Sequence, residues 1–371
     1  MHSKIEYANQ IIKNCIGKNG VYASTNRYKN QCWTRDFCLT VCPLLLAETP
    51  LKNVAIVKTH LLEIAKRQLP NGKVPILFLD DEIEFLREKV TKSIKTGEMS
   101  FMLKRYLDKD LENLTPHTRD GELLFILAVA QYFKKTSAEI MSSGDAKDNH
   151  TLFMASCKAL KYIESILVND LIPGADWRDT REDLNDKHVL TNACLLYKVY
   201  NEFEEKEKAE RVKNILLTKY WNGTYFIDYP GAPTFDILGN SLAVLFDVAD
   251  EKQRESIFTY TMELSTISGF KMCETFLPAL SGEEKEVMDR DKAVVWPFIN
   301  GFILRAMIER GDKKWQNVAV KEFAKWSKLD GFYEWYDIKN GNGFGSKEQI
   351  WSSAVYLTMY NNINKLNEKL F

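Results

Sequence analysis

The chain has 371 residues, of which 45% are hydrophobic and 27% charged, and its formal net charge is −1. This composition allows a large core, and a near-neutral balance without a basic block argues against a nucleic-acid or membrane surface as the main partner. The seven cysteines include no Cys-x-x-Cys pair, and the chain starts with the polar segment "MHSKIEYANQ". No apolar run approaches the roughly 20 residues that span a membrane. These features predict a reduced cytoplasmic protein.

Helical periodicity, with apolar residues at steps of three and four, runs through almost the whole chain. In chain order it predicts helices at 4–15, 36–48, 51–68, 120–134, 150–168, 188–203, 205–219, 234–247, 251–265, 294–310, 312–328 and 347–364. A further amphipathic segment, 83–106, predicts a helical insertion near 80–115. Only "VPILFL" (74–79) and "TYFIDY" (224–229) predict short strands. No long linker interrupts the series, so we expect one domain over residues 1–371.

The predicted helices alternate in character. Those that start near 36, 120, 188, 236, 294 and 347 are mostly apolar, whereas those at 51, 150, 205, 251 and 312 are more charged. A helix that is apolar on nearly all sides is buried, and one with a charged face is peripheral. With the helix at 4–15 as the remaining outer one, six inner and six outer helices in alternation predict an all-α fold, an (α/α)6 barrel of six hairpins. A helical solenoid is the alternative, although no fixed repeat of a single motif occurs.

Each predicted inner helix follows a loop rich in acidic and aromatic residues. In a six-hairpin barrel the N-termini of all inner helices open at the same end, so these side chains would converge on one mouth. Capping alone could explain single aspartates, because acids favour helix N-termini, but capping needs no Trp-x-Arg-Asp or Glu-Trp-Tyr-Asp. The six loops are "NQCWTRDF" (30–37), "TPHTRDGE" (115–122), "GADWRDTREDLND" (174–186), "PTFDILGN" (233–240), "MDRDKAVVWP" (288–297) and "GFYEWYDIKNGNGFGSKEQIW" (331–351).

Carboxylates and indoles at one mouth suit the cleavage of a glycosidic bond. One carboxylic acid protonates the leaving oxygen, and a second group acts as nucleophile or activates water. Aromatic faces and polar side chains can hold the sugar. The five histidines lack metal-binding spacing, so we expect no metal and no cofactor. The expected partner is a small carbohydrate, without nucleic acid or membrane, and the oligomeric state stays open.

The motifs also resemble a known family, the neutral/alkaline invertases. "WTRDFCLTVCPLLL" resembles that family's Trp-x-Arg-Asp-Phe segment, and "DGELLFILAVAQYF" resembles the segment that opens its next inner helix. "WRDTR" falls where the family has an Asp-Arg-Arg acid motif, and "DGFYEWYDIKNGNGFGSKEQIWSSAVYL" resembles its C-terminus. The matches keep their order over nearly the whole chain. The resemblance implies an (α/α)6 barrel and an inverting glycoside hydrolase.

Two segments depart from the invertase pattern. After the acid motif the chain has "EDLNDKHVLTNACLLY", which is nearer to debranching-type α-glucosidases, and "RDKAVVWPF" keeps only the Trp-Pro of an invertase stretch. The resemblance therefore implies one of two activities. The first is cleavage of sucrose or an α-glucoside. The second is that of a debranching- or trehalase-type α-glucosidase, which would act on an oligosaccharide or a glucosylated metabolite. A sugar epimerase and a non-catalytic carbohydrate-binding protein on the same fold are further alternatives.

The resemblance places the general acid within 174–181 and the base at Glu334. Asp179 is the first choice for the acid, because Trp-x-Asp-x-Arg matches the motif and Trp177 supplies an apolar wall. Asp176 is the rival, because Gly-x-Asp followed by Arg resembles the trehalase-type motif. An inverting enzyme should hold acid and base roughly 6.5–9.5 Å apart. The predicted sugar-binding residues are Trp33, Arg35, Asp36, Asp120, Trp177, Arg181, Trp296, Trp335 and Trp351.

Overall fold

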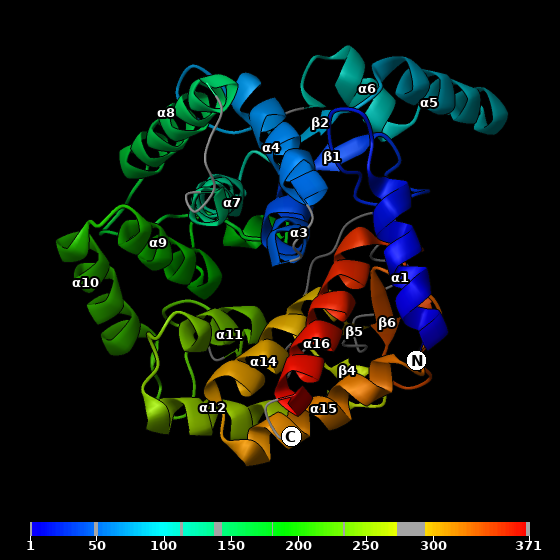
Figure 1. Cartoon of the computed structure of the whole chain (residues 1–371). Helices are drawn as coiled ribbons and strands as arrows, with labels where there is room; N and C mark the ends of the chain where they lie inside the picture. Colours follow the sequence, from blue (N-terminus) through cyan, green and yellow to red (C-terminus); the bar gives the residue numbers. More distant parts are fainter. Residues whose placement is uncertain are drawn as a thin grey trace.

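A computed structural model describes residues 2–47, 51–111, 114–136, 143–179, 181–232, 234–272 and 294–368. Its helices form two concentric layers around one axis (Figure 1), which confirms the predicted (α/α)6 barrel. The inner layer consists of a first helix made of α2 (Thr34–Asp36), the π-helical η1 (Phe37–Val41) and α3 (Cys42–Ala47), then α7 (Asp120–Thr136), α9 (Leu190–Glu202), α11 (Ile237–Leu245), α14 (Pro297–Arg310) and α16 (Ile350–Glu368).

The outer layer differs from the inner layer in how much of each helix is buried. Every residue of α11 is buried, whereas α10 buries only Ala209 and Val212. This contrast is the one that the alternating composition predicts, because an amphipathic helix turns one stripe to the core. The outer helices are α1 (His2–Cys15), α4 (Leu51–Lys66), α8 (Ser143–Ser165), α10 (Lys206–Ile215, extended by η4, Leu216–Tyr220), α12 (Glu251–Met262) and α15 (Lys313–Trp326).

The two ends of the chain close the ring. The last inner helix, α16, packs against η1 and α3 of the first one. Outside it lies α1, drawn in blue beside the red α16 in Figure 1. Lys4 Nζ on α1 donates a hydrogen bond to the backbone carbonyl of Trp326 at 2.6 Å, which ties α1 to the end of α15. The N-terminal helix is thus the outer partner of the C-terminal inner helix.

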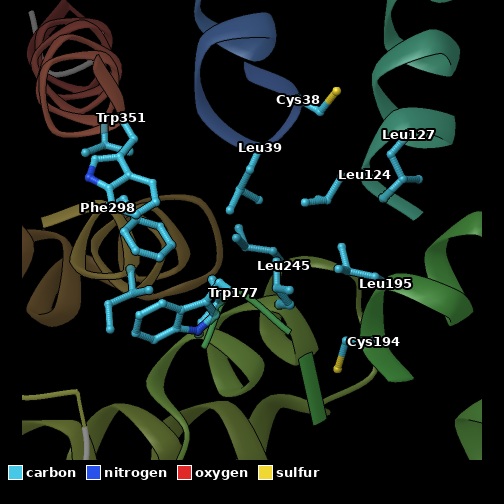
Figure 2. Close-up of a cluster of buried hydrophobic side chains, with 14 of the residues drawn as sticks. Cys38, Leu39, Leu124, Leu127, Trp177, Cys194, Leu195, Leu245, Phe298 and Trp351 are labelled. Carbon is cyan, nitrogen blue, oxygen red and sulfur yellow. The ribbon is translucent and has the colours of Figure 1, made fainter. Parts of the chain in front are cut away.

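Apolar side chains from the inner helices meet around the barrel axis (Figure 2). Phe298 stacks on Trp351 with ring centroids 4.4 Å apart, and Trp177 meets Phe298 edge-on at 5.1 Å. The aromatic residues of the loops are therefore continuous with the core of the barrel. The leucines that Figure 2 labels in the same buried cluster are Leu39, Leu124, Leu127, Leu195 and Leu245.

Short strands join the loops that lead into the inner helices. β1 (Gln31–Trp33) pairs antiparallel with β2 (Leu77–Leu79), in the register Cys32 opposite Phe78. A three-stranded sheet has the order β5 (Val294–Val295), β6 (Trp335–Asp337), β7 (Gly343–Phe344), and β3 (Ser265–Thr266) pairs with β4 (Gly269–Phe270). β2 confirms the second half of the strand predicted at 74–79, since residues 74–76 are not in a strand.

The strand predicted at 224–229 is wrong, since this segment makes only isolated bridges, Trp221 to Phe226 and Ile227 to Phe235. An inner-helix side chain takes the place of a neighbouring strand: Asn240 accepts from the Phe226 N–H at 2.9 Å and donates to its carbonyl at 2.7 Å. Asn300 makes the same pair of bonds to Phe270, at 2.7 and 2.9 Å. Such bonds satisfy buried backbone groups that no neighbouring strand reaches, at Phe226 outside any sheet and at Phe270 within β4.

Between β2 and α7 the chain adds two helices, α5 (Glu82–Thr96) and α6 (Phe101–Leu107), which we call the α5–α6 lobe. The lobe lies at the edge of the barrel (Figure 1). Leu77, Leu79, Phe85 and Leu111 form its own small core, and Trp33 packs against that core. Within the described part of the chain, no helix is both long enough and apolar enough to cross a membrane.

Candidate active site

The loops in front of the inner helices are joined to one another by backbone hydrogen bonds. The Arg119 N–H donates to the carbonyl of Ala175 at 2.9 Å, which joins loop 115–122 to loop 174–186. The Leu190 N–H donates to Asp228 at 2.6 Å, and the Ile350 N–H donates to Ala23 at 2.9 Å. These bonds hold the predicted site residues of different loops at one end of the barrel. Thr180, Pro233 and residues 273–293, which include 288–293 of the fifth loop, lie outside the described residues.

Arg35, in the first turn of the first inner helix, connects three loops. Its guanidinium binds both carboxylate oxygens of Asp120, at 2.5 and 3.0 Å, and its Nη1 lies 3.2 Å from Oδ2 of Asp179. Burial lowers the pKa of Arg35, but the charges of Asp120 and Asp179 outweigh it and raise this pKa above its ordinary value. Burial raises the pKa of Asp120, and Arg35 opposes that shift. The result is a buried, charged anchor at the mouth.

Asp179 is the more accessible of the two candidate acids. Its side chain is 27% exposed and meets Arg35 through one oxygen only. Among the described residues, no hydrogen bond to the other oxygen, Oδ1, is found. The ring Nε2 of His117 lies 2.6 Å from the Asp179 backbone carbonyl and fixes the loop at this point. Within the described part of the chain, the carboxylate is thus oriented through one oxygen, and the other oxygen has no protein partner.

Asp176 has a different environment, in which both oxygens are occupied. Arg178 donates to them from Nε at 2.8 Å and from Nη2 at 2.9 Å. The other edge of the same guanidinium binds Asp228, at 2.6 and 2.8 Å. Burial raises the pKa of Asp176, but Arg178 outweighs it and holds this pKa below its ordinary value. Asp176 is therefore an ionised, fully enclosed partner of Arg178.

Arg178 and Asp228 were not among the predicted site residues. Asp228 belongs to "TYFIDYPG", a segment that does not precede an inner helix directly. Its contact with Arg178 spans 50 residues. No spacing rule links the two residues, so only the fold shows that they form a pair.

Glu334 lies just before β6 and is buried. The Tyr28 hydroxyl donates to its Oε1 at 3.2 Å, and the Ser346 N–H donates to its Oε2 at 2.8 Å. Burial raises the pKa of Glu334; these hydrogen bonds oppose the shift, while the charge of Asp179 adds to it. The neighbouring Gly345 has φ +74°, and a Cβ there would lie 2.5 Å from the Glu334 Oε2. A glycine at 345 is thus needed to leave room for this carboxylate.

Asp36 lies near Glu334 and is also buried. Gln349 donates to its Oδ1 from Nε2 at 3.0 Å. Burial raises the pKa of Asp36 to about 8; Arg35 opposes this shift and Glu334 adds to it. At neutral pH Asp36 is therefore mainly protonated and can donate a hydrogen bond. Gln349, at the start of the last inner helix, was not among the predicted site residues.

Four predicted tryptophans form one aromatic cluster. Trp296 meets Trp177 at 5.2 Å, Trp335 at 4.9 Å and Trp351 at 5.8 Å between ring centroids. Trp33 lies apart from them and meets the edge of Tyr28 at 5.8 Å. In the described part of the chain, the indole N–H groups of all five are buried without a hydrogen-bond partner. Buried donors normally have a partner, so these N–H groups are candidate contacts for a ligand or for water.

Arg181 points to a partner within its own loop. Its Nε donates to Oδ1 of Asp183 at 2.6 Å, and its Nη1 is buried without a partner among the described residues. The described residues contain no group of three or more His, Cys, Asp or Glu side chains placed to hold a metal ion. The arrangement is therefore one of carboxylates, arginines and indoles.

Neither a protein-family model nor a curated protein matches the chain. Solved structures do match it. A variant glycosidase has a TM-score of 0.67 at 10% identity, over 98% of this chain and 96% of that one. A glycosidase variant in complex with glucose has a TM-score of 0.65 at 11% identity, over 98% and 96%.

A GH63 mannosylglycerate hydrolase from Thermus thermophilus, in complex with Tris and D-glycerate, has a TM-score of 0.63 at 11% identity, over 96% of this chain and all (100%) of that one. The specific resemblance to the invertase family stays a prediction. At such low identities the likeness concerns the fold. The chain shares the (α/α)6 barrel of these glycosidases over nearly its whole length.

Proposed function

We propose that the chain is a single catalytic domain, an inverting glycoside hydrolase that cleaves a small glycoside by general acid–base catalysis. The observation that carries the proposal is the pair Asp179 and Glu334. Both carboxylates belong to the mouth of the barrel, and their environments differ: Asp179 is partly exposed, whereas Glu334 is buried with both oxygens hydrogen-bonded. Acid and base roles need such a difference at a single pH.

Asp179 is the proposed general acid, in preference to Asp176. A proton donor must reach the leaving oxygen of the substrate. Asp179 has an oxygen free of protein partners among the described residues, whereas both oxygens of Asp176 are bound to Arg178. Asp176 also has a lowered pKa, which disfavours its protonated form. We therefore assign Asp176 to the support of the loop.

Glu334 is the proposed base that activates water. A base needs a proton affinity near the working pH, and the raised pKa of Glu334 moves it in that direction. Tyr28 and Ser346 fix its two oxygens, so its orientation toward a water does not depend on substrate. Asp36, protonated beside it, is proposed to donate to a sugar hydroxyl.

The sugar itself would be held by the indoles and the arginines. The unpartnered N–H groups of Trp177, Trp296, Trp335 and Trp351 offer donors beside apolar ring faces, a combination that suits a sugar ring. Trp33, Arg35, Asp120 and Arg181 complete the proposed set. That a structural neighbour was solved with glucose supports a hexose as the bound unit.

Sucrose or an α-glucoside is the proposed substrate. A debranching- or trehalase-type α-glucosidase, acting on an oligosaccharide or a glucosylated metabolite, is the second candidate, because "NACLLY" resembles those enzymes. An epimerase would need a histidine pair at the reacting carbon. The ring of His117 is instead engaged by the Asp179 backbone carbonyl, so the described contacts give no support to that alternative.

The test is a screen for released sugar with the purified chain. Sucrose, trehalose, maltose, isomaltose, small α-glucosides and mannosylglycerate would be incubated with the wild type and with Glu334→Gln as the inactive control. We expect one of them to release a free hexose whose first-formed anomer, followed by NMR, is opposite to that of the substrate. An epimer without hydrolysis, or equal turnover by Glu334→Gln, would contradict the proposal.

A further inference from the structure

The α5–α6 lobe carries an apolar surface that is exposed in the isolated chain. On α5, Ile83, Val90 and Ile94 are 73%, 42% and 77% exposed, and Met99 and Phe101 after it are exposed as well. A surface helix normally turns its apolar stripe toward the core. In α5 the opposite side, with Phe85, faces the core of the lobe. A cluster of exposed large apolar side chains of this kind is typical of an interaction surface.

The exposed residues of α5 follow the spacing of a helix–helix seam. Ile83, Arg87, Val90 and Ile94 recur at steps of four, three and four residues along the helix Glu82–Thr96. This is the spacing of the a and d positions of a coiled coil, which face a second helix. Arg87 is the one polar member and pairs with Glu84 of its own helix at 3.4 Å. We call these four residues the α5 seam.

The charges beside the seam indicate which helix fits it. The first half of α5 contains Glu82, Glu84 and Glu88 with the single cation Arg87, and the second half contains the exposed Lys92 and Lys95, whereas Lys89 is buried on the side of Phe85. A copy of the same helix in antiparallel orientation would place each acidic half against a basic half. A parallel copy would place like charges together, and an anionic membrane would attract only the basic half. The helix is thus complementary to itself in one orientation.

We propose that a second copy of this chain docks on the α5 seam, with the two α5 helices antiparallel about a two-fold axis. Ile83 of one copy then packs on Ile94 of the other, and Glu84 lies beside Lys95 of the other copy. Such an interface is isologous, so each contact occurs twice. The antiparallel arrangement also opposes the two helix dipoles favourably. The proposal does not depend on the proposed function.

The experiment is sedimentation velocity of the full chain over a range of concentrations. We expect a dimer for the wild type and a monomer for Ile94→Glu, with the dissociation constant raised by at least about tenfold, because each substitution enters the interface twice. Ile267→Glu is the matched control: Ile267 is another exposed isoleucine, 57% exposed, beside β3. This variant should dimerise as the wild type does, and unchanged circular-dichroism melts would show that both variants are folded.

A charge exchange tests the antiparallel orientation. Glu84→Lys should weaken the dimer, and the double variant with Lys95→Glu should restore it, because the complementary pair is then reversed. Any of three results would overturn the proposal. The wild type could stay monomeric at all concentrations, Ile94→Glu could leave the dimer unchanged, or the double variant could form a weaker dimer than Glu84→Lys. If the wild type is monomeric and floats with phosphatidylcholine–phosphatidylserine vesicles, and Ile94→Glu does not float with them, the seam binds a lipid surface instead.

Discussion

Two arginine–carboxylate clusters lie in the same ring of loops, and they differ in how completely their members are bound. In the first, Arg178 binds both oxygens of Asp176 and both oxygens of Asp228, and all three side chains are buried. In the second, Arg35 binds both oxygens of Asp120 but only one of Asp179, which stays 27% exposed. Each cluster joins residues that are distant in the sequence.

This difference distinguishes residues that hold the loops in place from residues that can take part in catalysis. A buried arginine with fully bound carboxylates has no capacity left for a substrate, and its loss leaves buried charges unpaired. A carboxylate bound through one oxygen is oriented and can still meet a ligand. We therefore expect substitutions in the Arg178 cluster to lower stability, and substitutions of Asp179 and its partner Glu334 to lower rate.

The largest effect is expected from Glu334→Gln. The amide keeps the shape of the side chain but cannot accept a proton from water, so kcat should fall about 10²–10⁴-fold. The free energy of unfolding should not show a comparably large loss, because the substitution puts a neutral group in place of a buried acid whose pKa is raised. Initial rates and urea unfolding measure both quantities. A stable variant that keeps its full rate would remove Glu334 from the mechanism.

The next effect concerns stability. Arg178→Met leaves Asp176 and Asp228 buried without their cation, and we expect the unfolding free energy to fall by about 3–5 kcal/mol. Arg305→Met is the control, since Arg305 pairs with Glu309 on the helix surface at 2.6 Å and exposed pairs contribute at most about 1 kcal/mol. Similar urea midpoints for the two variants would contradict the distinction between the clusters.

A smaller effect, dependent on pH, is expected from Asp36→Asn. Folding raises the pKa of Asp36 from 3.8 to about 8, so between these values the unfolded chain ionises this group and the native protein does not. The unfolded state then binds fewer protons, and the contribution of Asp36 to stability falls as pH rises through that window. Asn does not titrate and can still accept the bond from Gln349.

The gain in unfolding free energy of Asp36→Asn over the wild type should therefore grow from pH 4 toward pH 8. Urea unfolding of both proteins across this range measures it. Asp186→Asn is a control, because Asp186 is exposed and its pKa is lowered by Lys187. A difference between Asp36→Asn and the wild type that does not change with pH would contradict a protonated Asp36 in the folded protein.

The sequence predicted the helices well because their signal is local. Periodicity placed the starts of α4, α7 and α12 at 51, 120 and 251, as the structure has them. It could not show the π-helical segments at 37–41 and 216–220, which differ from α-helix in hydrogen bonding and not in apolar pattern. The strand predicted at 224–229 failed because its partner is the side chain of Asn240.

The candidate site was less predictable, because the two aspartates of "GADWRDTREDLND" lie in the same local sequence. Asp176 and Asp179 are three residues apart, and each is near an arginine. The two aspartates bind different arginines. Arg178, which also binds Asp228, binds Asp176, and Arg35 from the first inner helix binds Asp179. The contacts of Arg178 with Asp228 and of Arg35 with Asp179 are long-range, so the loop sequence alone does not show how the environments of the two aspartates differ.

The most direct test of the account compares the two aspartates with an activated leaving group. On the identified substrate both Asp179→Asn and Glu334→Gln should be slow. On the glycosyl fluoride of the same sugar, whose departure needs little protonation, Asp179→Asn should recover much of its rate and Glu334→Gln should not. Urea unfolding would first show that Asp176→Asn is folded. If this variant recovers its rate on the glycosyl fluoride and Asp179→Asn does not, the assignment of Asp179 as the acid is contradicted.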